Sequence, residues 1–180
     1  MSEGPLVLHL NGPPGVGKST LATRWAEEHP GTLLLDPDAL RTLVSGWRDD
    51  FVTTGALIRP VAIAMLSAYV AQGRDVALPQ LIANESELAR FESAARDAGG
   101  RFVEVFLESD DLSERFAARE RDQPWLEAVH ELVELAPADH LEQYADRLAA
   151  LSRARPDAVR LATRTGDLEG TYAALVAAVD

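Results

Sequence analysis

Short apolar runs along the chain alternate with longer segments in which apolar residues recur every three or four positions. The short runs predict buried β-strands, and the longer segments predict amphipathic helices. The predicted strands are residues 6–10, 32–35, 76–78, 102–107 and 158–161, and the predicted helices are residues 18–28, a helix from residue 39 onward, 56–72, 85–98, 110–121, 125–154 and 168–179. Strands that alternate with helices in this way are typical of an α/β fold with a parallel sheet covered on both faces.

The length and composition fit one domain. A chain of 180 residues can bury a sizeable core, and no linker-like stretch divides it. We therefore expect residues 1–180 to form a single domain. Residues from about 120 to 155 are helical but more charged, and we expect them to form a lid over the edge of the sheet where ligands bind.

Charge and composition exclude several classes of partner. The net charge of −12 argues against binding of nucleic acid or of an anionic membrane surface, but not against a small phosphate ligand. The absence of cysteine excludes disulfides and zinc thiolate sites. The longest apolar stretch, residues 56–71, contains Arg59 and Pro60 and predicts a buried helix rather than a membrane span. We expect a cytoplasmic monomer or homodimer.

The strongest motif follows the first predicted strand. Residues 12–19, GPPGVGKS, match the pattern G-x-x-x-x-G-K-[ST] at every fixed position, with a strand before it and a helix after it. In such a P-loop, glycines let backbone N–H groups converge on a phosphate chain. The lysine then supplies a mobile charge for the β- and γ-phosphates, and the hydroxyl supplies a magnesium ligand. The predicted nucleotide-binding residues here are Gly12, Pro13, Pro14, Gly15, Val16, Gly17, Lys18, Ser19 and Thr20.

The alternative interpretation is a glycine-rich turn with an incidental lysine, which a full match in this context disfavours. Other features narrow the class of P-loop protein. No Asn-Lys-x-Asp segment is present to read a guanine base. A motor or AAA-type ATPase is expected to have a longer chain and an acidic strand end. The predicted fold is therefore a P-loop NTPase three-layer sandwich with a five-stranded parallel sheet and a helical lid.

The segment LLLDPDALR places carboxylates at the end of the second predicted strand, on the same edge as the P-loop. There, Asp36 could take a proton from an acceptor hydroxyl or hold magnesium together with Ser19. Asp38 and Arg41 are candidate substrate-binding residues. The alternative role is a helix cap, with either Asp36 or Asp38 capping the next helix; capping by Asp38 is compatible with catalysis by Asp36.

These features resemble the small-molecule kinases of the nucleotide-kinase-like group, which includes shikimate and gluconate kinases, chloramphenicol phosphotransferase and the zeta toxins. The segment from DVALPQLIANESELARFE to ERFAARERD is similar in layout to the tunicamycin-resistance ATP-binding protein. The resemblance implies Mg²⁺-ATP as cofactor and transfer of the γ-phosphoryl group to a substrate hydroxyl. It also implies that Asp36 is the base or a metal-holding carboxylate.

One departure from these relatives concerns the third strand. In chloramphenicol phosphotransferase-like and zeta-like kinases this strand ends in an acidic residue, whereas here it ends in Leu78-Pro79-Gln80. Gln80 is a candidate hydrogen-bond partner for substrate, although an ordinary loop start explains the pair Pro79-Gln80 equally well.

Arginines supply the remaining candidates. Arg115 and Arg119 share one face of a predicted helix, and the resemblance implies that one of them contacts the nucleotide while Arg121 closes from the lid onto substrate. Pairing with the neighbouring acidic residues is the alternative. Arg59, in a mostly apolar helix, could face substrate or solvent. By resemblance, the loop containing Arg164 approaches adenine.

Three functions follow from these observations. The first is an ATP-dependent phosphotransferase acting on a small molecule, such as an antibiotic or metabolite, with Lys18, Asp36, Arg115 and Arg119 as the catalytic residues. The second is a non-catalytic, ATP-dependent protein that sequesters a small molecule. The third is a toxin-like kinase of nucleotide sugars.

Overall fold

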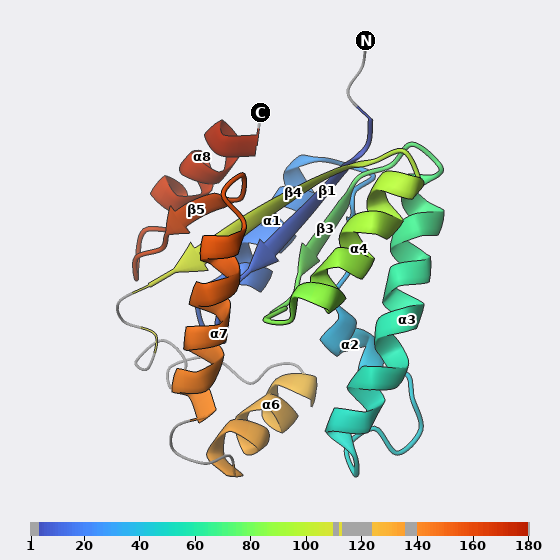
Figure 1. The fold of residues 1–180 in the computed structure, drawn as a ribbon, viewed down its shortest axis with the longest axis vertical. Helices are drawn as coiled ribbons and strands as arrows, with labels where there is room; N and C mark the ends of the chain where they lie inside the picture. Colours follow the sequence, from blue (N-terminus) through green and yellow to red (C-terminus); the bar gives the residue numbers. More distant parts are fainter. Residues whose placement is uncertain (1–3, 110–111, 113–123, 136–139, 180) are drawn as a thin grey trace.

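The computed structural model describes residues 4–109, 112, 124–135 and 140–179. Within these residues, five strands form one parallel sheet in the order β2-β3-β1-β4-β5 (Figure 1). The strands are β1 (Leu6–Asn11), β2 (Leu33–Leu34), β3 (Val76–Pro79), β4 (Arg101–Glu108) and β5 (Val159–Ala162). The helices are α1 (Lys18–Glu28), α2 (Pro37–Arg41), α3 (Phe51–Val70), α4 (Glu85–Asp97), α6 (Pro124–Leu135), α7 (His140–Ala154) and α8 (Leu168–Val179). The predicted α/β class and the five-stranded parallel sheet are confirmed.

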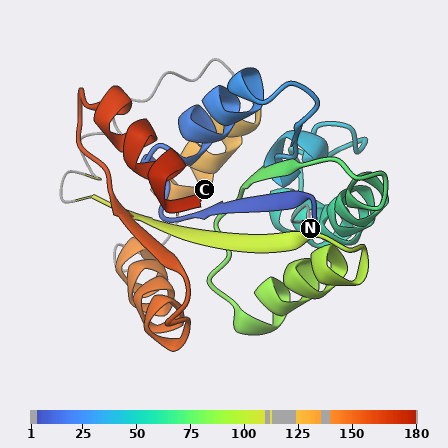
Figure 2. The same ribbon diagram turned by 90° about the horizontal axis from the view of Figure 1, so that it is seen from above.

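Helices cover both faces of the sheet, as Figure 2 shows with α1 and α8 on one side and α4 and α7 on the other. Alternate residues of β1 point to opposite faces because side chains alternate along a strand. Leu6, Leu8 and Leu10 pack in the core that includes α1 and α8, whereas Val7 packs in the core that includes α3, α4 and α7. Every residue of β1 is buried, which accounts for its nearly continuous apolar sequence.

Helix α3 is longer and more exposed than the sequence indicated. It begins at Phe51, five residues before the predicted start, because the Asp50 carboxylate caps it by accepting a hydrogen bond from Thr53 N at 3.0 Å. One face is buried, but Leu57 and Val61 are 60% and 47% exposed on the other. The prediction of a buried amphipathic helix therefore holds for one face and is wrong for the other.

By length and hydropathy alone, α3 is also the one helix among the described residues that could cross a membrane. Two observations favour a helix of the sandwich instead. Its inner face packs into the core beside β3 and α4, and Arg59 near its middle forms an ion pair with Glu87 of α4. A core helix of a soluble protein passes the same hydropathy test.

The region predicted to form a lid contains α6 and α7. In Figure 1, α6 lies beyond the carboxyl ends of the strands, near α2. Arg48, in the connection between α2 and α3, donates to the carboxylate of Glu127 at 2.8 Å and so links α6 to that connection. Trp125, the second residue of α6, is buried. The helix predicted over residues 110–121 falls almost entirely outside the described residues.

Candidate active site

The P-loop adopts a backbone conformation that requires glycine. Gly12, Gly15 and Gly17 all have positive φ angles, of 152°, 84° and 105°. A Cβ atom on Gly12 would lie 2.8 Å from Leu107 O and 2.9 Å from Val16 Cγ1, so a side chain does not fit there. Gly17 precedes α1 in the left-handed conformation, and no side chain caps that helix. The first N–H groups of an α-helix have no acceptor within the helix, so the start of α1 suits an anion.

Lys18 begins α1 and folds back over the loop. Its Nζ donates to Gly12 O at 2.7 Å and to Pro13 O at 2.9 Å, which keeps the ammonium at the mouth of the loop. Ser19 is half-buried beside it, whereas Thr20 is exposed. Val16 is fully buried and packs into the core shared with α1, and this packing anchors the P-loop to the core.

Asp36 follows β2 and is the N-cap of α2. Its Oδ1 accepts a hydrogen bond from Asp38 N at 2.9 Å. The helix begins at Pro37, two residues earlier than predicted, because proline suits the first helical position. The sequence left the capping role open between Asp36 and Asp38, and the structure assigns it to Asp36.

The electrostatic environment of Asp36 is unusual for a carboxyl group. Burial, followed by the nearby charge of Asp38, raises the pKa of Asp36 to about 6, against opposing effects from backbone N–H groups and from the Lys18 ammonium. Lys18 and Asp36 were predicted to act together, and the structure brings them close enough to interact electrostatically. A carboxyl group with this pKa is suited to accept a proton near neutral pH.

Asp38 and Arg41 form an ion pair one turn apart. Arg41 Nη2 lies 2.9 Å from Asp38 Oδ1, and Nη1 donates to Phe51 O at 2.9 Å. The guanidinium stacks over the Phe51 ring at 4.0 Å and is almost entirely buried. Gly55 makes room for it, because a Cβ atom there would lie 2.6 Å from Arg41 Nη2. These contacts give Arg41 a structural role between α2 and α3.

A second ion pair joins α3 to α4. Arg59 Nε contacts Glu87 Oε1, and both side chains are partly exposed. Burial lowers the pKa of Arg41, and among the charges acting on it are those of Asp38, Arg59, Asp36 and Glu87. The structure therefore brings together four of the predicted site residues, Asp36, Asp38, Arg41 and Arg59.

Gln80 lies at the start of the loop after β3 and is 6% exposed. Its side-chain amide nitrogen is 3.5 Å from Leu81 O, and its Oε1 has no hydrogen-bond partner among the described residues. Its backbone carbonyl is 2.9 Å from Nε2 of His9, the buried histidine of β1. A buried acceptor without a partner is consistent with the prediction that Gln80 meets a ligand.

The oxygen donors at this edge fit magnesium. The Ser19 hydroxyl and the Asp36 carboxylate are hard ligands of the kind that Mg²⁺ prefers, with the remaining positions taken by phosphate and water. Within the residues described, no group of three or more histidine or acidic side chains is arranged to hold a metal by itself.

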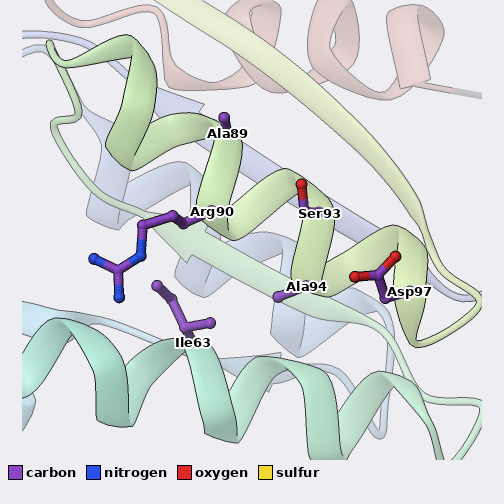
Figure 3. A pocket seen from close by; sticks show the side chains of 6 residues that line it. All are labelled: Ile63, Ala89, Arg90, Ser93, Ala94 and Asp97. Atoms are coloured by element: carbon purple, nitrogen blue, oxygen red, sulfur yellow. The ribbon is translucent and has the colours of Figure 1, made fainter.

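The remaining predicted residues lie elsewhere or are not described. Arg164 is exposed in the loop after β5, which is held against the end of β4 by the hydrogen bond from Thr163 N to Glu108 O at 2.8 Å. Arg115, Arg119 and Arg121 lie outside the described residues. A shallow surface hollow between α3 and α4 contains none of the predicted site residues (Figure 3); it is lined by Ile63, Ala89, Arg90, Ser93, Ala94 and Asp97.

Sequence reasoning missed Asn11, the last residue of β1. Its Oδ1 accepts hydrogen bonds from Gly12 N at 2.9 Å and from Ile82 N at 3.0 Å. It therefore joins the first residue of the P-loop to the loop after β3. The sequence motif begins one residue later, at Gly12, and gives no signal for this role.

Comparison with known proteins places the chain among P-loop proteins. The gluconokinase of Sinorhizobium meliloti 1021 is similar over 98% of this chain and 91% of its own, with a TM-score of 0.61 and 20% identity. The tunicamycin resistance protein of Deinococcus radiodurans is similar over 96% of this chain and 95% of its own, with a TM-score of 0.56 and 22% identity. The APS kinase of Mycobacterium tuberculosis, solved with AMPPNP and APS, is similar over 98% of both chains, with a TM-score of 0.56 and 18% identity.

These likenesses confirm the predicted resemblance and show that the chain has the fold of P-loop small-molecule kinases. A search of curated protein sequences gave no significant match. Residues 7–151 match the sequence model of the AAA_33 family, which is described as an AAA domain. From the sequence we set aside a motor or an AAA-type ATPase; the family is described as an AAA domain, while the structurally similar proteins above include small-molecule kinases. The chain belongs to the AAA_33 family of AAA domains.

Proposed function

We propose that this protein transfers the γ-phosphoryl group of Mg²⁺-ATP to a hydroxyl group of a small molecule. The observation that carries the proposal is the Asp36 carboxyl group, whose pKa is about 6 and which lies at the carboxyl end of β2 within electrostatic reach of Lys18. A phosphate-binding loop alone would serve many P-loop proteins. A proton acceptor beside that loop favours transfer to an alcohol.

In the proposed reaction, Asp36 accepts the proton of the acceptor hydroxyl. The hydroxyl oxygen forms a bond to the γ-phosphorus while the bond from that phosphorus to the β,γ-bridging oxygen breaks, which releases ADP. Backbone N–H groups of the P-loop and Lys18 would bind the phosphates, and Ser19 would hold Mg²⁺, which would supply charge neutralisation when bound. In its alternative role, Asp36 would hold Mg²⁺ together with Ser19 and would not be the base. Arg115 or Arg119 would add positive charge over the transferring group.

Nucleotide binding at this site is supported by the loop geometry and by the AMPPNP complex of the structurally similar APS kinase. Arg164 would approach the base from the loop after β5. The helices α6 and α7 would act as the lid of a single cytoplasmic domain that spans residues 1–180 and works as a monomer or homodimer.

The acceptor would meet Asp38, Arg59, Gln80 and Arg121. Arg41, predicted for the same role, is buried against Phe51 and would act through its ion pair with Asp38. Among the described residues, both arginines are already paired with carboxylates, Arg41 with Asp38 and Arg59 with Glu87. An anionic acceptor would have to separate one of these pairs. We therefore propose a neutral or cationic hydroxylated acceptor, such as an aminoglycoside, nucleoside, amphenicol or sugar.

The test is ADP release from Mg²⁺-ATP in the presence of a panel of these compounds. We expect one class to stimulate ADP release, and Asp36→Asn to lower kcat at least a hundredfold while AMPPNP still binds. The matched control is Asp97→Asn, which removes an exposed carboxylate at the far end of α4 and leaves turnover unchanged. Full activity in Asp36→Asn would overturn the proposal.

A second candidate function is supported by the end of β3, where Pro79-Gln80 supplies no carboxylate. Without an acidic residue there, the protein could bind ATP and sequester a small molecule without transferring phosphate. Tight acceptor binding that depends on ATP, with no release of ADP, would favour this function. Stimulation by nucleotide sugars alone would favour a toxin-like kinase.

A further inference from the structure

Asn11 is fully buried, and its side-chain amide uses all of its hydrogen-bonding capacity. Its Oδ1 accepts the two hydrogen bonds from Gly12 N and Ile82 N described above. Its Nδ2 donates to Ile82 O at 2.8 Å and to Glu104 Oε1 at 3.2 Å. The two donors and two acceptors around the amide fix which end is oxygen and which is nitrogen. Asn11 therefore holds Gly12 and Ile82 at a set separation for as long as the amide keeps this orientation.

Glu104 of β4 supplies one of these four hydrogen bonds, as the acceptor for Nδ2. It is 4% exposed, and its second carboxylate oxygen, Oε2, accepts from Arg155 Nε at 3.0 Å. His9 Nδ1 lies 3.6 Å from Oε1. Burial alone would raise the pKa of Glu104, but contacts with His9, Asn11 and Arg155 more than offset burial and lower it. An ionised Glu104 accepts hydrogen bonds and does not donate them, so it favours the Nδ2 end of the Asn11 amide.

Arg155 connects this buried group to helices around it. It comes directly after the last residue of α7, and its Nη1 donates to Glu92 Oε2 of α4 at 2.8 Å. The guanidinium thus contacts both β4 and α4, and its residue directly follows α7, one of the two helices of the predicted lid. A continuous series of hydrogen bonds runs from the end of α7 through Glu104 and Asn11 to the first N–H of the P-loop.

We propose that Asn11 and Glu104 are positioning residues for the P-loop and for the loop after β3, and that Arg155 links the position of α7 to them. The proposal rests on the proposed function in one respect, because it takes the ligand of the P-loop to be a nucleoside triphosphate. None of the three residues needs to touch that nucleotide.

The physical basis is the cost of leaving a buried charge without its partner. Without the Arg155 guanidinium, ionised Glu104 loses its arginine partner and becomes easier to protonate. A protonated or rotated Glu104 no longer accepts from Asn11 Nδ2, so the amide loses one of its four hydrogen bonds and holds Gly12 N and Ile82 N less firmly. Both N–H groups would then exchange with solvent more readily.

The first measurement is hydrogen exchange at the Gly12 and Ile82 amides in the full chain without nucleotide. We expect Arg155→Met to increase exchange at both amides about tenfold. Its matched control, Arg153→Met, removes an exposed arginine two residues earlier and leaves both rates unchanged. Arg155→Lys keeps one charge that can reach Glu104 or Glu92, but not both at once, and is expected to recover part of the loss.

The second measurement is the Kd of Mg²⁺-AMPPNP, taken well below the melting temperature of each variant. We expect it to rise about tenfold in Arg155→Met and in Glu104→Gln and to stay within twofold in Arg153→Met. Arg155 is 28% exposed, so its truncation is less disruptive to folding than a change at Glu104.

A lower melting temperature with unchanged exchange and unchanged Kd would show that the three residues only stabilise the fold, and would overturn the proposal. The exchange measurement needs no nucleotide and decides the positioning role alone. If the wild-type protein failed to bind Mg²⁺-AMPPNP, the proposed function would fail instead. The two failures are thus distinguishable.

Discussion

At the scale of single residues, the raised pKa of Asp36 predicts a pH dependence of catalysis. Asp36 must be ionised to accept a proton, and its pKa is about 6. The rate kcat is therefore expected to fall about tenfold for each pH unit below 6 and to level off above pH 7. Steady-state ADP release between pH 4.5 and 8 measures this, with AMPPNP affinity followed over the same range as control. A kcat that stays constant down to pH 5 would contradict the prediction.

The same carboxyl group predicts a pH dependence of stability. The folded-state pKa of about 6 lies above the ordinary value of 3.8, so folding favours the protonated form. This stabilisation is fully present below about pH 4 and is lost as the pH rises through 6. Asn cannot ionise but can still cap α2. Asp36→Asn is therefore expected to raise the free energy of unfolding by about 2 kcal/mol at pH 8, and by much less at pH 4.

Urea unfolding of both proteins at the two pH values measures the difference. Equal effects at pH 4 and pH 8 would show that folding does not perturb the ionisation of Asp36. A gain in stability combined with a loss of turnover would be the pattern expected when an ionised group is kept buried for catalysis.

At the scale of elements, Gly55 decides how α3 meets α2. Helix propensity alone predicts that Gly55→Ala stabilises α3 by about 1 kcal/mol. The new Cβ, however, would lie 2.6 Å from Arg41 Nη2 and 2.7 Å from Arg41 Cζ, in a guanidinium that is buried and cannot easily move. We expect the steric effect to win and the free energy of unfolding to fall by about 1–3 kcal/mol.

The matched control for this substitution is Gly170→Ala in α8. Its Cβ would approach the exposed carboxylate of Asp167, which can rotate away but would then lose the hydrogen bond that its Oδ1 accepts from Gly170 N at 3.0 Å. The melting temperature is expected to fall further for Gly55→Ala than for Gly170→Ala, because Arg41 is buried and Asp167 is exposed. An equal rise in the melting temperature of both variants would show that the Arg41 side chain can move aside without destabilising the fold.

Element boundaries show where sequence reasoning succeeds. The apolar runs of β1, β3, β4 and β5 locate those strands to within a residue or two at each end. In β1 and β3, burial on both faces leaves a continuous apolar signal, whereas β5 lies at the other edge of the sheet and is only partly buried. Only residues 33–34 of the predicted strand 32–35 pair as β2, which lies at the edge of the sheet. The start of α3 was missed because its cap, Asp50, lies in a run of charged residues and is recognised only by its bond to Thr53 N.

The candidate site divides in the same way. The P-loop and Asp36 were predictable because a motif or a strand end marks them in a few consecutive residues. The bonds that join Asn11 to Glu104 and Glu104 to Arg155 span 93 and 51 residues. A pattern of neighbouring residues cannot predict contacts over such distances in sequence. In the sequence, Glu104 is only a charged residue that interrupts an apolar strand. Only the arrangement of the strands reveals it.

At the scale of the whole molecule, α3 raises the question of where the protein resides. We expect the wild-type protein to stay in the supernatant after membranes are sedimented, because Arg59 pairs with Glu87 within the length that would have to cross the bilayer. Replacing Leu57 and Val61 by Gln should change neither this distribution nor AMPPNP affinity, since both side chains are largely exposed. Recovery of wild-type protein, but not of the variant, with membranes would contradict the expectation.

The cap formed by Asp36 has a consequence for redesign of this protein. The Asp36 side chain caps α2 and is also expected to receive the proton, so its length must suit both roles. Glu at position 36 would keep the acidity but would carry the carboxylate one methylene farther from the Asp38 amide. A redesign that moves the carboxylate to suit a bulkier alcohol would therefore also have to provide another cap for α2.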